Sequence, residues 1–309
     1  MATKSIVATL DLSIVPRARY PRSAVLADYW ALTKPEVNFL IIITTFAGFY
    51  LARATGWGNF PVWLSINTLL GTLSVASGTG TLNQYLERRF DAQMRRTARR
   101  PLAGGRLNPA AVLWFGLALS VVGSVYLAIA VNVLASLLAI ATLLSYLFFY
   151  TPLKRKTPLC TLVGAFPGAM PPLIGWAAAS GKLNFEAWTL YAMLFLWQFP
   201  HFMAIAWMYR EDYARAGYLV LPPDDSVRAR LLNLQTMLPL LALMPLSLLP
   251  GSMGEAKVYL IGALLLAAGF FYYAAQLVLR RSNSAARHLL AASIIYLPAL
   301  FVLMVLARG

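Results

Sequence analysis

The chain has 309 residues, of which 60% are hydrophobic and only 12% are charged, and its mean hydropathy is +0.66. These values exclude a soluble globular domain and predict an integral membrane protein. The formal net charge of +15 does not indicate a nucleic-acid partner, because membrane topology and attraction to anionic lipid headgroups explain it.

Residues 1–33 are predicted to be a cytoplasmic N-terminal segment. Its first 23 residues lack the apolar stretch of a cleavable signal peptide, and residues 24–32 predict a short helix at the membrane interface. The remainder, 34–309, is predicted to form one membrane domain. It contains nine apolar stretches that are long enough to cross a bilayer. They cover residues 37–54, 62–86, 109–130, 132–150, 158–178, 186–209, 233–250, 257–278 and 287–307. We therefore predict an all-α, polytopic membrane protein with about nine transmembrane helices around a central cavity.

Lysine and arginine residues alternate between the two sides of this arrangement. All but four of the 26 basic residues lie in the N-terminal segment or in the loops after the second, fourth, sixth and eighth stretches. The four exceptions are Arg53, Lys182, Lys257 and Arg308. The positive-inside rule therefore places the N-terminus and the basic loops in the cytoplasm.

The second stretch ends in NQYLERRFDAQMRRTARRPL, residues 83–102. A helix places Asn83, Glu87 and Asp91 on one face, because they are four residues apart. Carboxylates suit Mg²⁺, which commonly also takes phosphate oxygens, and Arg96 and Arg100 downstream suit the remaining anionic oxygens. The pattern predicts a diphosphate site with a bridging metal. The alternative interpretation is a solvated helix end whose acids are neutralised by the arginines.

Residues 145–176, SYLFFYTPLKRKTPLCTLVGAFPGAMPPLIGW, form a second cluster. Tyr150 and Lys154 flank a helix end, where prolines enforce a break. Three prolines also interrupt the fifth stretch, which indicates a broken helix beside a cavity or buried protein. For the basic run 154–156, topology alone is an alternative explanation.

A histidine lies inside the sixth apolar stretch. His201 follows Gln198 by three residues and precedes Asp212 by eleven, so a continuous helix would place His201 and Asp212 on one face, roughly 16 Å apart. That spacing suits a deep acceptor site and a shallow diphosphate site. An intramembrane histidine is also often a hydrogen-bond partner between helices, whereas the functional interpretations are a heme ligand or an acid–base residue.

These three tracts resemble the UbiA superfamily of intramembrane aromatic prenyltransferases. The Asn-x-x-x-Glu-x-x-x-Asp pattern resembles its first acidic motif, and the segments RRTARRPL, YTPLKR, GAMPPLIGW and WQFPHF resemble one branch, the protoheme IX farnesyltransferases. Glu87 stands where the family commonly has aspartate, Arg89 stands where many relatives have an acid, and 211–212 is the sole acidic pair near a usual second motif. The resemblance runs from about Lys34 to the C-terminus and leaves residues 1–25 outside.

The resemblance implies transfer of a farnesyl group from farnesyl diphosphate to a vinyl group of heme b, with addition of water, giving heme O. It also implies Mg²⁺, an inner (cytoplasmic) membrane location with the active site facing the cytoplasm, and a connection to heme A synthase or to heme-copper oxidase assembly. The residue roles that it implies are as follows: Glu87, Asp91 and Asp212 as metal ligands; Asn83 as a positioning amide; Arg96, Arg100, Tyr150, Lys154, Arg155 and Arg210 for diphosphate; Trp197, Gln198 and His201 on the heme side.

Three alternatives remain open at this stage. A related prenyltransferase acting on a quinone precursor or another aromatic acceptor would keep the diphosphate chemistry. A membrane carrier would also show broken helices and intramembrane polar groups. A non-catalytic oxidase assembly factor would tolerate loss of Asp91.

Overall fold

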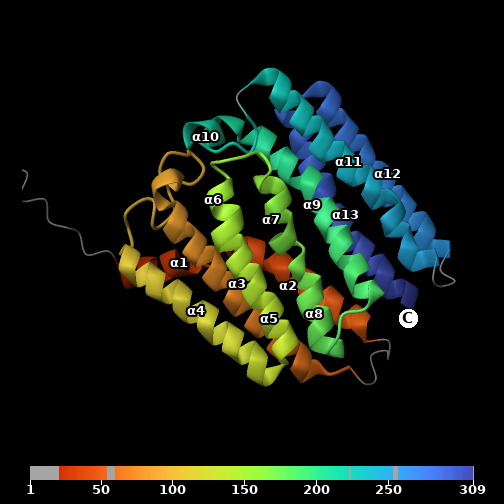
Figure 1. Cartoon of the computed structure of the whole chain (residues 1–309), viewed down its shortest axis with the longest axis horizontal. Helices are drawn as coiled ribbons and strands as arrows, with labels where there is room; N and C mark the ends of the chain where they lie inside the picture. The colour runs from red at the N-terminus through yellow and green to blue at the C-terminus, as the bar shows by residue number, and fades with distance from the viewer. Residues whose placement is uncertain (1–20, 54–59, 223, 253–256, 309) are drawn as a thin grey trace, which may run out of the picture.

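The computed structural model describes residues 21–53, 60–222, 224–252 and 257–308, and all regular structure in these ranges is helical (Figure 1). The short helix predicted over 24–32 is α1 (Arg22–Leu32), and its location at the membrane interface stays a prediction. The other elements are α2 (Pro35–Ala52), α3 (Val62–Asp91), α4 (Pro109–Ala130), α5 (Val133–Leu144), the π-helical turn η2 (Ser145–Tyr150), α6 (Thr151–Leu153), α7 (Cys160–Gly168), α8 (Met170–Ser180), α9 (Phe185–Met208), α10 (Arg210–Arg215), α11 (Asp225–Ser252), α12 (Lys257–Arg280) and α13 (Asn283–Arg308). Most of the predicted N-terminal segment, residues 1–20, lies outside the described residues.

Each predicted apolar stretch coincides with helical structure. Eight spans among the described residues are long and apolar enough to cross a membrane. The one remaining predicted stretch, 62–86, corresponds to α3, which has 30 residues but carries buried polar side chains such as Thr68, Thr72 and Ser77. The all-helical membrane fold is confirmed, whereas the count of nine crossings and the orientation of the N-terminus stay predictions.

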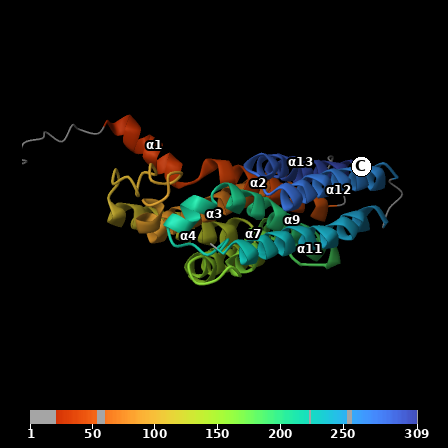
Figure 2. The same ribbon diagram turned by 90° about the horizontal axis from the view of Figure 1, so that it is seen from above.

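The helices lie side by side, with α3, α4 and α5 toward one flank and α9, α11, α12 and α13 toward the other (Figure 1); Figure 2 shows α11 to α13 grouped together from above. Between the flanks, α2 packs on α8. Large apolar side chains point outward: Ile129, Val258 and Leu279 are 76% to 82% exposed. Such exposure is expected where helices face lipid.

The helices α3 and α4 pack with their backbones close together. A Cβ atom on Gly78 of α3 would lie 2.8 Å from the carbonyl oxygen of Gly116, and one on Gly123 of α4 would lie 2.9 Å from the amide nitrogen of Val75. Side chains at these positions would overlap backbone atoms, so the glycines permit the contact. This packing fixes the helix that carries the two carboxylates.

The predicted interruption of the fifth stretch is confirmed. Its two halves, α7 and α8, meet at Ala169, and Pro167, Pro171 and Pro172 lie within three residues of that junction. The buried side chain of Gln198 on α9 supports the break, because its Nε2 donates a hydrogen bond to the carbonyl oxygen of Ala165 at 2.8 Å. The Ala165 carbonyl oxygen, next to the break, thus has a side-chain hydrogen-bond partner inside the protein.

The expectation that His201 and Asp212 share one continuous helix is wrong. The helix α9 ends at Met208, and Tyr209 has non-helical dihedral angles (φ −109°, ψ 20°) before α10 begins. Figure 1 shows α10 leaving the direction of α9. A tertiary contact explains the break between the two helices. Asp212 accepts a hydrogen bond at 3.2 Å from the backbone amide of Arg96, which lies in the distant loop after α3.

Candidate active site

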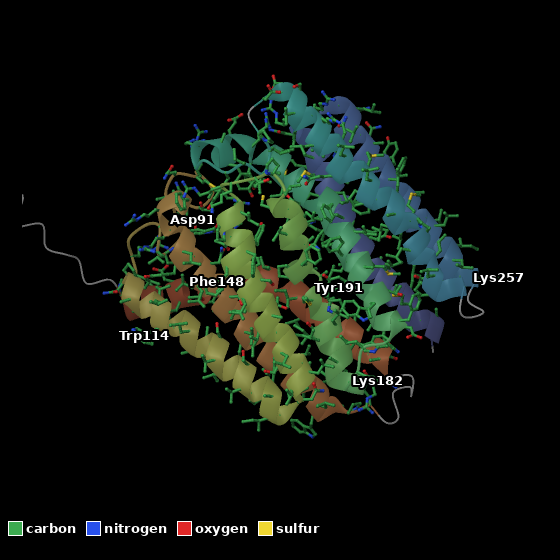
Figure 3. The ribbon with its side chains drawn as sticks, in the orientation of Figure 1. Asp91, Trp114, Phe148, Lys182, Tyr191 and Lys257 are labelled. Atoms are coloured by element: carbon green, nitrogen blue, oxygen red, sulfur yellow. The ribbon has the colours of Figure 1, made fainter. Side chains whose placement is uncertain are left out.

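The carboxylates lie at one end of the helices. Asp91 is at the C-terminal end of α3, whereas Lys182 and Lys257 lie at the opposite end of the molecule (Figure 3). The loop after α3, residues 92–108, is here called the arginine loop. This arrangement agrees with the separation of basic residues read from the sequence.

Glu87 is the centre of a buried hydrogen-bond network. Its side chain accepts hydrogen bonds from Lys154 Nζ at 2.9 and 3.1 Å, from Asn83 Nδ2 at 3.0 Å and from the Tyr218 hydroxyl at 3.0 Å. The residue is only 6% exposed. A buried carboxylate requires such partners, because removal from water disfavours its charge.

Asp91 has its own cation. Its Oδ2 atom lies 2.8 Å from Arg100 Nη1 in the arginine loop, and the residue is 2% exposed. The loop is also anchored at this point because the Thr97 hydroxyl donates to the backbone carbonyl of Asp91 at 2.7 Å. The two predicted carboxylates are thus each paired with a predicted diphosphate-binding residue.

Asn83 connects this pair to a residue that the sequence prediction missed. Lys34 Nζ donates to Asn83 Oδ1 at 2.9 Å, while Asn83 Nδ2 donates to Glu87 and to the Thr151 hydroxyl, the latter at 3.2 Å. The amide therefore lies between an ammonium from the start of α2 and a carboxylate on α3. This position agrees with a positioning role for Asn83.

Tyr218 is the second residue that the prediction missed. Gly217 adopts φ +70°, a conformation that suits glycine, and this turns the chain sharply after α10. The Leu219 amide then donates to the carbonyl oxygen of Lys154 at 2.8 Å, which places the Tyr218 ring beside Glu87. A Gly-Tyr pair directly after a short helix was the available sequence signal.

The charges of this network favour the binding of an anion. Burial, together with the nearby Arg100 and Lys154, lowers the pKa of Lys34 to about 7. Burial also opposes the charge on Lys154, but the Glu87 carboxylate outweighs it and holds the Lys154 pKa well above its ordinary value. Burial and the adjacent Glu87 raise the pKa of Tyr218, which keeps its hydroxyl protonated and donating.

A pocket of about 400 Å³ opens beside this network. Its lining includes Glu87, Phe90, Thr151, Arg155 and Tyr218. The Arg155 guanidinium lies 4.0 Å from the centre of the Phe90 ring, an arrangement that holds this cation at the pocket wall. The pocket joins polar groups with apolar lining, as expected of a site for a small amphipathic molecule.

The comparisons with known proteins agree with this geometry. The model of the UbiA prenyltransferase family matches residues 41–303. The chain belongs to the UbiA prenyltransferase family. It is 47% identical over 291 residues to a protoheme IX farnesyltransferase of Solibacter usitatus, covering 91% of this chain and 98% of that protein. A protoheme IX farnesyltransferase of Koribacter versatilis is 40% identical, with 93% and 94% covered. The resemblance inferred from the sequence is therefore confirmed.

Solved structures of the UbiA family share the fold. A structure of a digeranylgeranylglyceryl phosphate synthase in membranes has a TM-score of 0.73 at 16% identity and covers 92% of this chain and 98% of its own. A UbiA homolog from Archaeoglobus fulgidus bound to GPP and Mg²⁺ has a TM-score of 0.63 at 14% identity, with 90% and 99% covered. At these identities the comparison establishes the fold.

The residues at the end of α3 have the chemistry to fit a magnesium ion. Glu87 and Asp91 offer carboxylate oxygens on one helix face, and Mg²⁺ commonly takes one or two carboxylates together with phosphate oxygens. Within the part of the chain that the structure describes, no group of three or more histidine, cysteine or acidic side chains could hold a metal.

Asp212, the third predicted metal ligand, has other partners in this structure. Its Oδ1 atom lies 2.9 Å from Arg215 Nη2, and its Oδ2 atom accepts from the Arg96 amide. The Arg96 side chain lies over the Tyr209 ring, 4.5 Å from its centre. These contacts connect α10 with the arginine loop.

The other predicted residues divide between the two flanks. The ammonium of Lys154 lies 4.6 Å from the centre of the Tyr150 ring, so Tyr150 belongs to the site. Arg210 Nη1 instead donates to Asn283 Oδ1 on α13, at 2.9 Å. Arg210 thus joins α10 to the opposite flank.

The heme-side candidates form a separate group at the contact of α9 with α13. His201 Nδ1 lies 2.8 Å from the Ser293 hydroxyl, and Trp197 Nε1 donates to the Ser293 carbonyl oxygen at 2.9 Å. The Trp197 and His201 rings stack with their centres 4.7 Å apart. Gln198, as described, binds the backbone of α7. Ser293 orients His201, a feature that the sequence pattern did not indicate.

Proposed function

We propose that this chain transfers a farnesyl group from farnesyl diphosphate to a vinyl group of heme b, with addition of water, and releases heme O and diphosphate. The observation that carries the proposal is the pair of buried carboxylates on α3, each matched by a cation from another segment. The choice of heme b as the acceptor is supported by the similarity of the chain to protoheme IX farnesyltransferases.

The chain's own residues stabilise the leaving diphosphate. Breaking the allylic carbon–oxygen bond leaves negative charge on the diphosphate oxygens, and fixed cations stabilise that charge more than they stabilise the bound substrate. Lys154 and Arg100 are held at Glu87 and Asp91, and Arg155 lies at the pocket wall. These three cations bind and orient the diphosphate.

Glu87 and Asp91 hold Mg²⁺ in this proposal, and Asn83 orients Glu87 through its amide. When bound, the metal supplies positive charge next to the phosphate oxygens. The apolar pocket lining, including Leu86, Phe90 and Leu147, excludes water from the farnesyl fragment until the vinyl carbon attacks it.

The heme lies toward α9 and α13 in this proposal, with His201 as its polar neighbour. In this proposal the diphosphate site faces the cytoplasm from the inner membrane, which the positive-inside rule supports. Heme O leaves toward heme A synthase or heme-copper oxidase assembly, since the farnesyl chain makes the product a membrane-bound ligand for such proteins.

The test is an assay of the purified protein in detergent with heme b, farnesyl diphosphate and Mg²⁺, followed by mass spectrometry of the heme. We expect a heme that carries one hydroxyethylfarnesyl substituent, and we expect its loss with a chelator and in Asp91→Asn. Glu211→Gln, an exposed carboxylate on α10, is the matched control and keeps activity.

Two other results would redirect the proposal. If farnesyl diphosphate is consumed only with a phenolic acceptor, the chain is a UbiA-type prenyltransferase for another aromatic ring. If no acceptor leads to its consumption, the catalytic proposal fails and a carrier or assembly role gains support.

A further inference from the structure

We infer that Ser293 on α13 is a positioning residue for the heme acceptor. It holds His201 in the neutral form that carries its proton on Nδ1, which leaves the lone pair on Nε2 for the heme iron. The identity of the acceptor rests on the proposed function. The position of the proton follows from side-chain contacts between α9 and α13, whatever the acceptor is.

Ser293 lies where α9 packs on α13, and it is 0% exposed. Its hydroxyl oxygen lies 2.8 Å from Nδ1 of His201 and 2.7 Å from the carbonyl oxygen of Leu290, which is one turn earlier on α13. Both distances are those of hydrogen bonds. The backbone of Ser293 takes part as well, because its carbonyl oxygen accepts from Trp197 Nε1. Ser293 is thus joined to α9 by its side chain and by its main chain.

The number of hydrogens in these contacts fixes the proton of the imidazole. A serine hydroxyl has one hydrogen to donate, and a carbonyl oxygen can only accept. The Ser293 hydrogen therefore points to the Leu290 carbonyl, and the hydroxyl oxygen must accept at its second contact, from His201 Nδ1. The opposite assignment would leave two oxygen atoms 2.7 Å apart with no hydrogen between them. The assignment that satisfies both contacts places the proton on Nδ1.

The imidazole ring is also held in one orientation. The Trp197 ring stacks on it with centres 4.7 Å apart and an angle of 26°, and the Phe202 ring meets it edge-on at 5.5 Å. Turning the ring over would exchange the two nitrogens and break the hydrogen bond to Ser293. Aromatic neighbours also favour the neutral imidazole over the charged one. A neutral ring with its hydrogen on Nδ1 has its lone pair on Nε2.

This arrangement suits a histidine that meets a metal ion. A neutral imidazole binds a metal through the nitrogen that has the lone pair, and a hydrogen-bond partner on the other nitrogen fixes the tautomer and orients the ring. In the proposed function, His201 is the polar neighbour of heme b, so its Nε2 atom would face the iron. Ser293 acts through His201, because it determines which nitrogen is offered to the acceptor and in which direction.

Nitrogen-15 NMR of the full-length protein in detergent, labelled at histidine, reads the position of the proton without any ligand. The chain has two histidines, so His288→Gln leaves the signals of His201 alone. We expect a hydrogen on Nδ1 in the unsubstituted protein and a mixture of the two tautomers in Ser293→Ala. Ser247→Ala on α11 is the matched control and should change nothing, since Ser247 is also 0% exposed and also donates to the carbonyl oxygen three residues earlier.

A titration of the same protein with ferric heme b, followed by absorbance and electron paramagnetic resonance, measures ligation of the iron. We expect the spectrum of a histidine-ligated heme, and we expect His201→Ala to lose it. Ser293→Ala should bind heme about 10-fold to 100-fold more weakly, the usual effect of removing the hydrogen-bond partner of a ligating histidine. Ser293→Thr keeps a hydroxyl and should restore both the tautomer and the heme affinity. KM for farnesyl diphosphate should stay unchanged in all three variants.

Three results would overturn the inference: a hydrogen on Nε2 in the unsubstituted protein, a heme spectrum that persists in His201→Ala, or equal heme affinities in Ser293→Ala and Ser247→Ala. The unfolding temperature in detergent reports any loss of folding, and Ser293→Cys replaces an unfolded Ser293→Ala, because a thiol is only a weak acceptor. Weakened heme binding in Ser293→Ala, in a protein that never farnesylates heme, would uphold the role of Ser293 and reject the proposed reaction. Farnesylation of heme with equal heme affinities in the two serine variants would do the reverse.

Discussion

At the scale of single residues, Glu87 depends on donors from distant segments. Lys154 follows α6, Tyr218 follows α10, and both donate to the same carboxylate on α3. Hydrogen bonds to a buried charged group contribute more than those between neutral groups. Each donor should therefore have a measurable effect on the metal and diphosphate site.

The Tyr218 hydroxyl provides a test with a minimal change. We expect Tyr218→Phe to lower kcat by roughly tenfold, because one charge-assisted hydrogen bond to Glu87 is lost. Steady-state farnesylation of heme b measures this, with Tyr272→Phe on the exposed surface of α12 as control. Equal kcat values for the two variants would show that Lys154 and Asn83 orient Glu87 without Tyr218.

Lys34 makes stability depend on pH. Its pKa is about 7 in the folded protein and 10.5 ordinarily, so between these values the unfolded chain binds the extra proton. Rising pH therefore favours the folded state in this window, because unfolding must take up a proton there. The charged groups facing Lys34 are Arg100, Lys154, Glu87 and Asp91.

The expected result is a rise in unfolding temperature from pH 7 to pH 9, measured by thermal unfolding in detergent. Lys34→Met should flatten this rise, since it removes the titrating group. A slope that is the same in Lys34→Met would assign the pH dependence to another residue.

The sequence predicted those residues of the candidate site that can be recognised within one short segment of the chain. Asn83, Glu87 and Asp91 follow from helical periodicity, and Lys154 from its tract after the fourth stretch. Lys34 and Tyr218 could not be predicted in the same way, because their places depend on the connection between α1 and α2 and on the turn after α10, which tertiary hydrogen bonds fix. The local sequence pattern predicts which residues lie on the same face of a helix. It does not predict which distant segment packs against that face.

At the scale of elements, an ion pair joins α1 to the arginine loop. Asp28 on α1 and Arg106 form a two-fold hydrogen-bonded ion pair, with Nε to Oδ2 at 2.9 Å and Nη2 to Oδ1 at 2.8 Å. Arg106 also donates to the carbonyl oxygen of Arg99 at 3.0 Å, directly before the residue that pairs with Asp91. A planar guanidinium on a buried carboxylate fixes geometry as well as charge.

Breaking this pair should loosen the arginine loop. We expect Asp28→Asn to increase hydrogen exchange across residues 92–108, and we expect the exchanged charges of Asp28→Arg with Arg106→Asp to restore protection in part. Hydrogen-exchange mass spectrometry in detergent measures both. The single change Asp225→Asn, on the exposed start of α11, is the control. Unaltered exchange in Asp28→Asn would show that the apolar contacts of α1 suffice to hold the loop.

Element boundaries also show where periodicity misleads. The sixth stretch continues in the sequence toward Asp212 without a proline or glycine until Gly217, so one long helix was a reasonable expectation. The structure ends α9 at Met208 because Asp212 binds the Arg96 amide and α10 turns toward it. A side chain with a distant partner thus outweighs local helix propensity.

At the scale of the whole molecule, the basic residues gather at the end that carries the carboxylates. Lys182 and Lys257 mark the other end in Figure 3. The composition and the hydrophobic stretches were sufficient to predict the helical membrane fold, because lipid requires every backbone group to be satisfied within the helix. Composition alone does not give the number of crossings, since α3 buries polar residues along its length.

Labelling from the two sides of the membrane tests the orientation. The chain contains one cysteine, Cys160, which is buried, so cysteines introduced at exposed positions report their own side. We expect Lys182→Cys to react with a membrane-impermeant maleimide in intact cells, and Arg280→Cys to react only after the membrane is opened. The reverse result would invert the proposed topology and place the site outside the cytoplasm.

The close packing of α3 on α4 has a consequence for motion during turnover. Gly78 and Gly123 bring the two backbones together, so relative sliding of these helices would cause overlap of main-chain atoms. We therefore expect the carboxylate side of the site to stay in place. We expect adjustment to an incoming ligand in the short segments around Lys154 and Tyr218, which are joined by the hydrogen bond from the Leu219 amide to the Lys154 carbonyl oxygen. Opening and closing of the site would then be a displacement of this paired segment against a rigid helical base.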